Sequence, residues 1–354
     1  DNTGATSLTK SGAGTWVLAG TNTYTGVTTI SAGTLSVATI GNGGVAGNLG
    51  QAANSAANIV LDGGTLKYTG AAGSTDRLFT LTNNGGTIDA SGTGALSFAS
   101  TGNIAFTGTN ARTLTLTGTN TGSNTLTPVL GDNTGATSLT KSGAGTWVLT
   151  GVETYTGATT ISAGILQIGG SGSLGSGSYA GNISIAASST FEYSSSATQS
   201  LNTGVISGAG NLTKDTDTSS VLTLAGTNTY TGVTTISAGT LSVATIGNGG
   251  VAGNLGQAAN SAANIVLDGG TLKYTGAAGS TDRLFTLTNN GGTIDASGTG
   301  ALSFASTGNI AFTGTNARTL TLTGTNTGSN TLTPVLGDNT GATSLTKSGA
   351  GTWV

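Results

Sequence analysis

The amino-acid sequence predicts an all-β fold, a parallel β-helix (β-solenoid), and three observations predict it. Apolar residues alternate with threonine, serine or asparagine in short runs, glycine-rich corners separate these runs, and the pattern recurs in nested repeats. Alternation with a period of two is typical of half-buried strands, and glycine and asparagine tolerate the positive φ that sharp corners require. Abundant glycine, threonine and serine also disfavour helices.

The first strands can be placed in order along the chain, because each pair of alternating runs flanks a corner such as Ala32-Gly33 or Asp62-Gly63-Gly64. The alternation predicts strands at 28–31, 34–37, 58–61, 65–68, 79–82 and 87–89. These units recur roughly every 17 to 30 residues, which is close to one coil of a solenoid. About 17 coils stacked at roughly 4.8 Å would form a rod about 80 Å long.

The core of such a solenoid is one coil thick, and its apolar side chains point inward from successive coils. The inward positions that the alternation predicts are Ile30, Leu35, Val37, Ile59, Leu61, Leu66, Phe79, Leu81, Ile88 and Ile104.

Two repeats of different length are nested in the chain. Residues 18–148 recur without a mismatch as residues 224–354, a shift of 206. A shorter motif occurs at 8–35, 139–166 and 212–241, and a fourth copy begins at Leu345. A string of β-sandwich domains would need linkers, and none is evident, so we expect residues 1–354 to form a single continuous solenoid cut from a longer array.

The composition excludes several classes of chemistry. Charged residues make up 6% of the 354 residues, the net charge is −3, and histidine and cysteine are absent. Histidine-dependent triads, thiolate nucleophiles, disulfides and Cys-ligated metal sites are therefore ruled out. The scattered lysines and arginines form no basic patch for nucleic acid, and no stretch is long and apolar enough for a transmembrane helix.

The short motif resembles the passenger-associated repeat of bacterial autotransporters. Its first copy reads GAGTWVLAGTNTYTGVTTISAGTL from Gly12 to Leu35. The residues that match the family pattern are Leu8, Lys10, Gly12, Gly14, Leu18, Gly20, Asn22, Thr23, Tyr24, Gly26, Thr28, Gly33 and Leu35, whereas Trp16 stands where a leucine is usual. The second copy departs from the others at Glu153, and the third has Thr218-Ser219-Ser220 in place of the GAG segment.

This resemblance implies a right-handed parallel β-helix on the outer surface of a Gram-negative bacterium, delivered by type V secretion. In that family the repeat is linked to folding and export of the passenger.

Aromatic residues of the motif are candidates for contacts with sugar or protein, but packing explains them better. Leu222 occupies the position of Trp16 in the third copy, so we expect Trp16, Trp147 and Trp353 to be packed. Tyr24, Tyr155 and Tyr230 are expected to cover a corner, where asparagine and threonine side chains satisfy backbone groups.

Carboxylates and glycine runs offer weaker candidates. Asp215 and Asp217 are the best-spaced carboxylates, but calcium needs more oxygen ligands than they supply, so a solvated loop is expected. Asp62, Asp76 and Asp89 lie in or beside corners that explain them as turn residues. The run 41–44 lacks the lysine and the helix of a phosphate-binding loop.

Threonines at alternate positions of 113–121 suggest an ice-binding face, which would need the same register on every coil. Other coils carry Leu61, Lys67 and Asp89 instead, and this argues against it.

The sequence therefore predicts an extracellular structural and adhesive stalk or fibre with no catalytic, cofactor-binding or metal-binding residues and no cofactor. The expected partners are neighbouring repeats of the same protein, self-association into fibres and weak carbohydrate or cell-surface contacts, with no nucleic acid and no membrane insertion. A polysaccharide-active β-helix enzyme and a specific receptor-binding module remain the alternatives.

Overall fold

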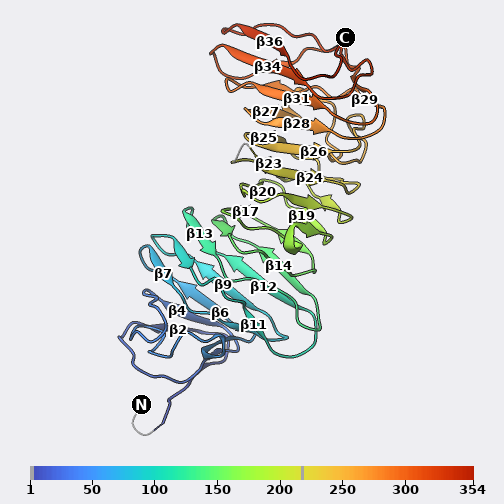
Figure 1. Ribbon diagram of the computed structural model, residues 1–354. Helices are drawn as coiled ribbons and strands as arrows, with labels where there is room; N and C mark the ends of the chain where they lie inside the picture. Colours follow the sequence, from blue (N-terminus) through green and yellow to red (C-terminus); the bar gives the residue numbers. More distant parts are fainter. Residues whose placement is uncertain (1–3, 217–218) are drawn as a thin grey trace. The chain divides into compact units, whose positions relative to one another are not determined.

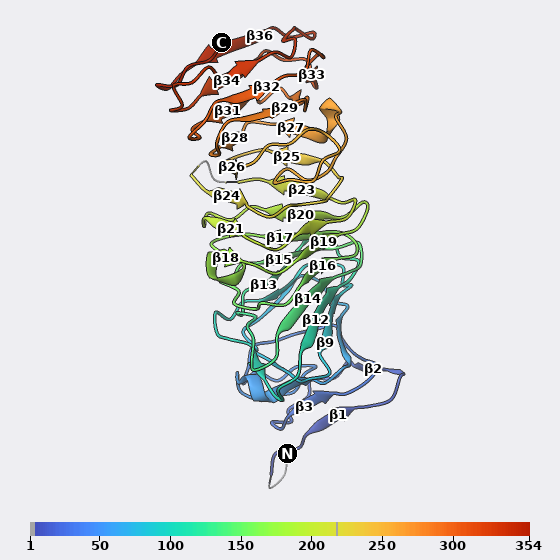
Figure 2. The ribbon, with the colours of Figure 1, turned by 90° about the vertical axis from the view of Figure 1, so that its right-hand side faces the viewer.

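The computed structural model describes residues 4–216 and 219–354. It confirms the predicted all-β parallel β-solenoid, with about 15 turns where about 17 were predicted. The chain forms two compact units, Asp1–Ser176 and Gly177–Val354, within each of which the strands stack in successive coils (Figures 1 and 2). That residues 1–354 form one continuous solenoid stays a prediction.

The first unit has three parallel sheets, and each coil contributes a strand to two or three of them. The first sheet contains β1 (Leu8–Lys10), β3 (Thr28–Ile30), β5 (Ile59–Leu61), β8 (Thr80–Leu81) and β11 (Ala105–Phe106). The second contains β2 (Thr15–Leu18), β4 (Thr34–Val37), β6 (Thr65–Tyr68), β9 (Gly86–Ala90), β12 (Arg112–Thr117), β14 (Thr137–Lys141) and β16 (Thr159–Ile161). The third contains β7 (Gly73–Thr75), β10 (Leu96–Phe98), β13 (Ser123–Leu126), β15 (Thr146–Leu149) and β17 (Ile165–Ile168).

The second unit is also built of parallel strands. One sheet contains β18 (Ser178–Tyr179), β21 (Gln199–Leu201), β24 (Val221–Leu224), β26 (Thr240–Val243), β28 (Thr271–Tyr274), β31 (Gly292–Ala296), β34 (Arg318–Thr323) and β36 (Thr343–Lys347). Another contains β20 (Thr190–Tyr193), β23 (Asn211–Lys214), β25 (Thr234–Ile236), β27 (Ile265–Leu267), β30 (Thr286–Leu287) and β33 (Ala311–Phe312). Two smaller groups are β19 (Ile183–Ile185) with β22 (Ile206–Ser207), and β29 (Gly279–Thr281), β32 (Leu302–Phe304) and β35 (Thr331–Leu332).

The coils are uneven in length, which accounts for the lower number of turns. Leu8 pairs with Thr28, 20 residues later, whereas Thr28 pairs with Ile59, 31 residues later. The longer coil contains an excursion between β4 and β5, so it adds residues without adding a turn.

The described helices are the 3-10 turns η1 (Ala56–Asn58), η2 (Gly175–Gly177) and η3 (Ala262–Asn264). Within residues 4–216 and 219–354, no helix approaches the length and apolarity of a membrane span.

The predicted inward residues form the core of the first unit. Each of the ten, from Ile30 to Ile104, is at most 2% exposed. Register places like residues on like residues, as where Leu35 pairs with Leu66 and Leu66 pairs with Ile88. Each column of apolar side chains therefore continues from coil to coil, and hydrogen bonding between neighbouring coils satisfies the strand backbone.

Copies of the short motif lie on different sheets of the solenoid. In the first copy, β1 and β3 belong to the first sheet and β2 and β4 to the second. In the second copy, the equivalent strands β14 and β16 belong to the second sheet, and β15 and β17 to the third. The residues between the copies therefore do not form a whole number of coils, and the motif moves one sheet around the solenoid.

Candidate functional site

The repeat motif builds a corner where a buried lysine binds backbone carbonyl groups. Lys141 ends β14 and is fully buried between Leu116 and Ile161 of the adjacent coils. Its Nζ donates hydrogen bonds to the carbonyl oxygens of Ser142 at 2.9 Å, Gly143 at 2.8 Å and Ala163 at 2.9 Å. The first two carbonyls follow β14 directly and the third belongs to the next coil. We call this arrangement the lysine clasp, because it ties two successive coils together.

The first motif copy has the same clasp. Lys10 is fully buried and its Nζ donates to the carbonyl oxygens of Ser11 at 2.9 Å, Gly12 at 2.6 Å and Ala32 at 3.0 Å. In both copies the lysine occupies an inward column that is otherwise apolar. Only its ammonium group reaches the polar corner.

The glycines of the motif make room for the clasp. Gly164 has a φ of +69°, and a Cβ there would lie 2.4 Å from the Gly145 carbonyl oxygen and 2.8 Å from Lys141 Nζ. Burial without a carboxylate partner lowers the pKa of Lys141 to about 8.

The third copy keeps the two bonds within the corner despite its altered corner sequence. Lys214 Nζ donates to the carbonyl oxygens of Asp215 at 3.1 Å and Thr216 at 3.0 Å. Thr216 takes the place of Gly12 and Gly143 and has a φ of +59°, a region that costs free energy for a residue with a Cβ. The lysine therefore holds this corner shape even where glycine is absent.

The motif tyrosines cover the adjacent corner, as predicted. The hydroxyl of Tyr155 lies 2.7 Å from Thr159 Oγ1, and both side chains are fully buried. Tyr230 makes the equivalent contact with Thr234 at 2.8 Å, and burial raises the pKa of Tyr230 to about 12. Tyr24 is half-buried and contacts Thr28 at 2.8 Å.

Replacing Tyr155 with phenylalanine is expected to lower the free energy of unfolding by about 1 to 2 kcal/mol, because it removes a buried hydrogen bond to Thr159. Tyr24→Phe should lower the free energy of unfolding by less, because water can replace the lost contact at this half-buried side chain. Chemical denaturation of both variants checks this, and equal losses would contradict it.

Asparagine side chains form hydrogen bonds with backbone groups beside these tyrosines. Asn228 Nδ2 donates to the carbonyl oxygen of Asn254 at 2.9 Å, and its Oδ1 accepts from the Ile206 amide at 2.9 Å. Asn22 Nδ2 likewise donates to the carbonyl oxygen of Asn48 at 3.0 Å. The expectation that asparagine satisfies corner backbone groups is confirmed.

Glu153 occupies the asparagine position in the second copy, and its carboxyl group is fully buried. Its Oε2 accepts a hydrogen bond from the Leu130 amide at 2.6 Å, while Oε1 has no hydrogen-bond partner among the described residues. Burial raises the pKa of Glu153 to about 8, although the bond from Leu130 opposes this shift. The sequence marks this position as a departure from the motif, but its burial emerges only from the fold.

The prediction that all three motif tryptophans are packed is wrong for Trp16. Trp147 is fully buried, pairs with Asn124 and Leu166 on its two sides, and donates through Nε1 to the Thr117 carbonyl at 2.9 Å. Trp16 is 50% exposed, because β2 is an edge strand on which Trp16 pairs with Leu35 alone. Trp353 is half-buried and donates to the Thr323 carbonyl at 2.9 Å.

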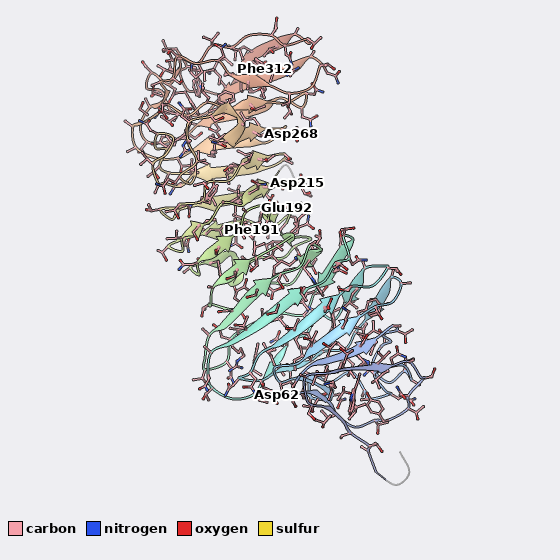
Figure 3. All side chains as sticks on the ribbon, turned by 180° about the vertical axis from the view of Figure 1, so that it is seen from behind. Asp62, Phe191, Glu192, Asp215, Asp268 and Phe312 are labelled. Atoms are coloured by element: carbon pink, nitrogen blue, oxygen red, sulfur yellow. The ribbon has the colours of Figure 1, made fainter. Side chains whose placement is uncertain are left out.

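The predicted carboxylates do not form one site. Asp215 accepts from the Thr216 amide at 2.7 Å and from Ser194 Oγ at 3.4 Å, and it lies at a half-exposed corner near Glu192 (Figure 3). Asp217 lies outside the described residues. Within the described part of the chain, no three acidic residues gather as metal ligands would.

The interpretation of Asp89 as a turn residue is wrong. Asp89 lies within β9, and its Oδ2 is 3.2 Å from Lys67 Nζ on the neighbouring strand. The pair is partly exposed, so it adds little stability. Asp62 and Asp76 do lie at corners, where Asp76 Oδ1 accepts from the Gly43 amide at 2.7 Å.

The glycine run 41–44 belongs to the excursion between β4 and β5, and Arg77 holds this excursion in place. The Arg77 guanidinium is buried and donates to the carbonyl oxygens of Gly41 at 3.0 Å, Ala52 at 3.1 Å and Gly50 at 2.9 Å. The glycines therefore shape a loop that is bound to the solenoid by backbone contacts.

One column of threonines runs along the second sheet, which the sequence did not reveal. Strand register aligns Thr15, Thr34, Thr65, Thr87, Thr115, Thr140 and Thr160. The neighbouring column contains Ser36, Lys67 and Asp89, so a face with two unbroken threonine columns does not form there.

Comparison with known proteins identifies the motif. The passenger-associated-transport-repeat model matches residues 8–37, 139–168 and 219–243. The first two matches contain the complete clasps of Lys10 and Lys141, and the third begins after Lys214. No solved structure matches the chain.

The chain is also similar to the adhesin BmaC autotransporter of Brucella suis biovar 1 (strain 1330). The two are 38% identical over 369 residues, which covers 95% of this chain and 10% of that protein. The chain thus spans about a tenth of its relative, and the similarity extends beyond the three motif copies. The chain therefore contains three copies of the passenger-associated-transport repeat and is similar to a segment of an autotransporter adhesin.

Proposed function

We propose that the chain is part of an extracellular, non-catalytic adhesive stalk on the outer surface of a Gram-negative bacterium. The observation that carries this proposal is the repeated lysine clasp within a parallel solenoid, because it is a device for joining coils rather than for chemistry. The similarity to the Brucella adhesin autotransporter supports the same function.

The chemistry of the described residues also supports a passive role. The groups with strongly shifted pKa values are Lys141, Glu153 and Tyr230, and all three are fully buried, where no substrate reaches them. The outer face is formed by threonine, serine and a few paired charges, as at Lys67 and Asp89. Such a surface favours weak, repeated contacts with carbohydrate or with neighbouring copies over a single strong one.

Adhesion of beads coated with the chain tests the proposal. We expect the coated beads to remain attached under flow to host-cell or matrix-coated surfaces from which beads coated with an unrelated β-solenoid wash off. Equal detachment would contradict adhesion. Release of reducing ends from acidic or neutral glycans, abolished by a single aspartate substitution, would contradict the non-catalytic role.

A further inference from the structure

A polar groove of about 440 Å³ lies at the coil corners between the first and second sheets. Its volume is within the range of small-ligand sites. The groove is formed by three successive coils, and its lining residues are Asp62, Thr82, Asn83, Asn84, Thr107, Gly108 and Asn110. No apolar side chain lines it, so hydrogen bonding is the chemistry that it offers.

One carboxylate oxygen of Asp62 accepts hydrogen bonds from the protein, and the other is free to accept one from a ligand. Its Oδ1 accepts from Thr82 Oγ1 at 2.6 Å and from Asn84 Nδ2 at 2.8 Å. Its Oδ2 has no hydrogen-bond partner in the part of the chain that the structure describes. The two bonds fix the carboxylate in place, so a ligand would not have to order it.

The side-chain amide of Asn83 is also fixed, but through its oxygen, so that its free group is a donor. Its Oδ1 accepts from the Asn110 amide at 3.0 Å and from Arg112 Nη2 at 3.3 Å, and this leaves Nδ2 as a donor without a partner among the described residues. Gly108 packs so closely on this amide that a Cβ there would lie 2.3 Å from Nδ2. The groove therefore presents a fixed acceptor and a fixed donor, beside the exposed side chains of Thr107 and Asn110.

The same arrangement is built a second time in the other unit. Asp268 Oδ1 accepts from Thr288 Oγ1 and from Asn290 Nδ2, the latter at 2.9 Å, and Asn289 Oδ1 accepts from the Asn316 amide at 3.0 Å. Asp62 and Asp268 lie at corners directly after β5 and β27 rather than within a strand; both residues are labelled in Figure 3. The duplication of residues 18–148 thus repeats the fixed acceptor and the fixed donor, and we call the corner at Asp268 and Asn289 the second groove.

We infer that each groove binds a neutral glycan through neighbouring hydroxyl groups, an inference that rests on the proposed adhesive function. A sugar hydroxyl both donates and accepts, so vicinal hydroxyls match the fixed Asp62 acceptor and Asn83 donor. The Asp62 carboxylate disfavours sulfated or uronic-acid glycans by repulsion. Calcium needs about six or more oxygen ligands, which is more than the free Asp62 oxygen and its neighbouring amide and hydroxyl groups provide. The groove has no aromatic lining, so binding is weak and adhesion relies on repetition.

One isosteric substitution in each groove tests the inference without removing the bonds that hold the groove. Asp62→Asn keeps Oδ1 and replaces the free charged acceptor with a neutral donor, so that the groove presents two donors and no acceptor. Asp268→Asn makes the same change in the second groove.

Isothermal titration with millimolar cellotetraose, laminaritetraose, mannotetraose and galactotetraose measures binding. We expect at least one neutral tetrasaccharide to bind at two sites per chain, and to bind about tenfold more weakly at a groove in which a neutral donor has replaced the charged acceptor. The control is Asp89→Asn with Asp295→Asn, which changes aspartates outside the grooves and should leave two sites. Circular dichroism checks that every variant is folded.

The inference is overturned if no neutral tetrasaccharide binds, if Asp62→Asn with Asp268→Asn leaves the affinity unchanged, or if only heparin oligosaccharides or Ca²⁺ alone bind. The bead assay separates this inference from the proposed function. If beads carrying Asp62→Asn and Asp268→Asn adhere as strongly as beads carrying the unchanged chain, the groove inference fails and adhesion stands. If beads carrying the unchanged chain do not adhere, the proposed function fails whatever the titration gives.

Discussion

Replacing Glu153 with glutamine is expected to abolish most of the pH dependence of stability between about pH 4.5 and 7.5. In the folded chain the buried carboxyl group has a pKa of about 8, against an ordinary value of 4.5. The folded state therefore holds a proton that the unfolded state releases over this range. The free energy of unfolding of the unchanged chain should therefore fall by roughly 4 kcal/mol as the pH rises from about 4.5 to 7.5.

The glutamine variant has no such proton to lose. Its Oε1 can accept the hydrogen bond from the Leu130 amide in place of Glu153 Oε2, so the fold keeps this contact. The titratable side chain of the preceding turn is Asp132, which is engaged with the Thr137 amide at 2.6 Å and Thr156 Oγ1 at 2.6 Å. The following turn, residues 173–176, carries no charge.

Denaturant unfolding at several pH values, kept below the range in which Lys141 titrates, measures this effect. Glu192→Gln is the matched control, because Glu192 is the other glutamate of the chain and is half-exposed. The control should keep the slope of stability against pH. If the free energy of unfolding of the Glu153 variant still falls with pH, or if that of the control does not, the pH dependence arises from a group other than Glu153.

Replacing Lys141 with methionine is expected to lower the free energy of unfolding by roughly 3 kcal/mol or more, since three carbonyl groups lose a charged donor. Methionine fills a similar volume in the column between Leu116 and Ile161, so the loss reports the clasp rather than a cavity. The lowered pKa of Lys141 shows that burying the charge has a cost of its own, which offsets part of the clasp's contribution.

The chain offers a matched control in the repeated sequence. Lys347 has the same sequence on its N-terminal side, and its Nζ donates to the carbonyl oxygens of Ser348 at 2.8 Å and Gly349 at 2.9 Å, but it is exposed. Lys347→Met should change stability by less than about 0.5 kcal/mol, as surface substitutions usually do. If chemical denaturation shows that the two variants lose similar free energies of unfolding, the clasp does not stabilise the fold.

Alternation was enough to find six strands and ten core residues of the first unit. The expected strand at 34–37 matches β4 and that at 65–68 matches β6, and all ten inward residues are buried. This succeeds because a strand alternates its side chains between two faces whatever its neighbours are. The motif likewise indicated that Tyr155 and Tyr230 cover a corner.

Alternation could not show which inward positions carry charge. Lys10 and Lys141 read as ordinary charged residues in the sequence, yet both point inward, because the carbonyls that bind them come from a corner and from the next coil. Asp89 was misassigned for a related reason, since Lys67 becomes its neighbour only when β6 and β9 pair.

The sequence by itself determined the fold class, the repeats, the resemblance of the motif to the passenger-associated repeat and the absence of histidine and cysteine chemistry, because each depends on local pattern or composition. Only the tertiary structure decided which residues meet. Coil length sets the register, and coils vary, so Leu8 meets a residue 20 positions later whereas Thr28 meets one 31 positions later. The threonine column and the pairing of Lys67 with Asp89 follow from that register. The burial of Trp147 and the exposure of Trp16 follow instead from whether a strand pairs on both sides or on one.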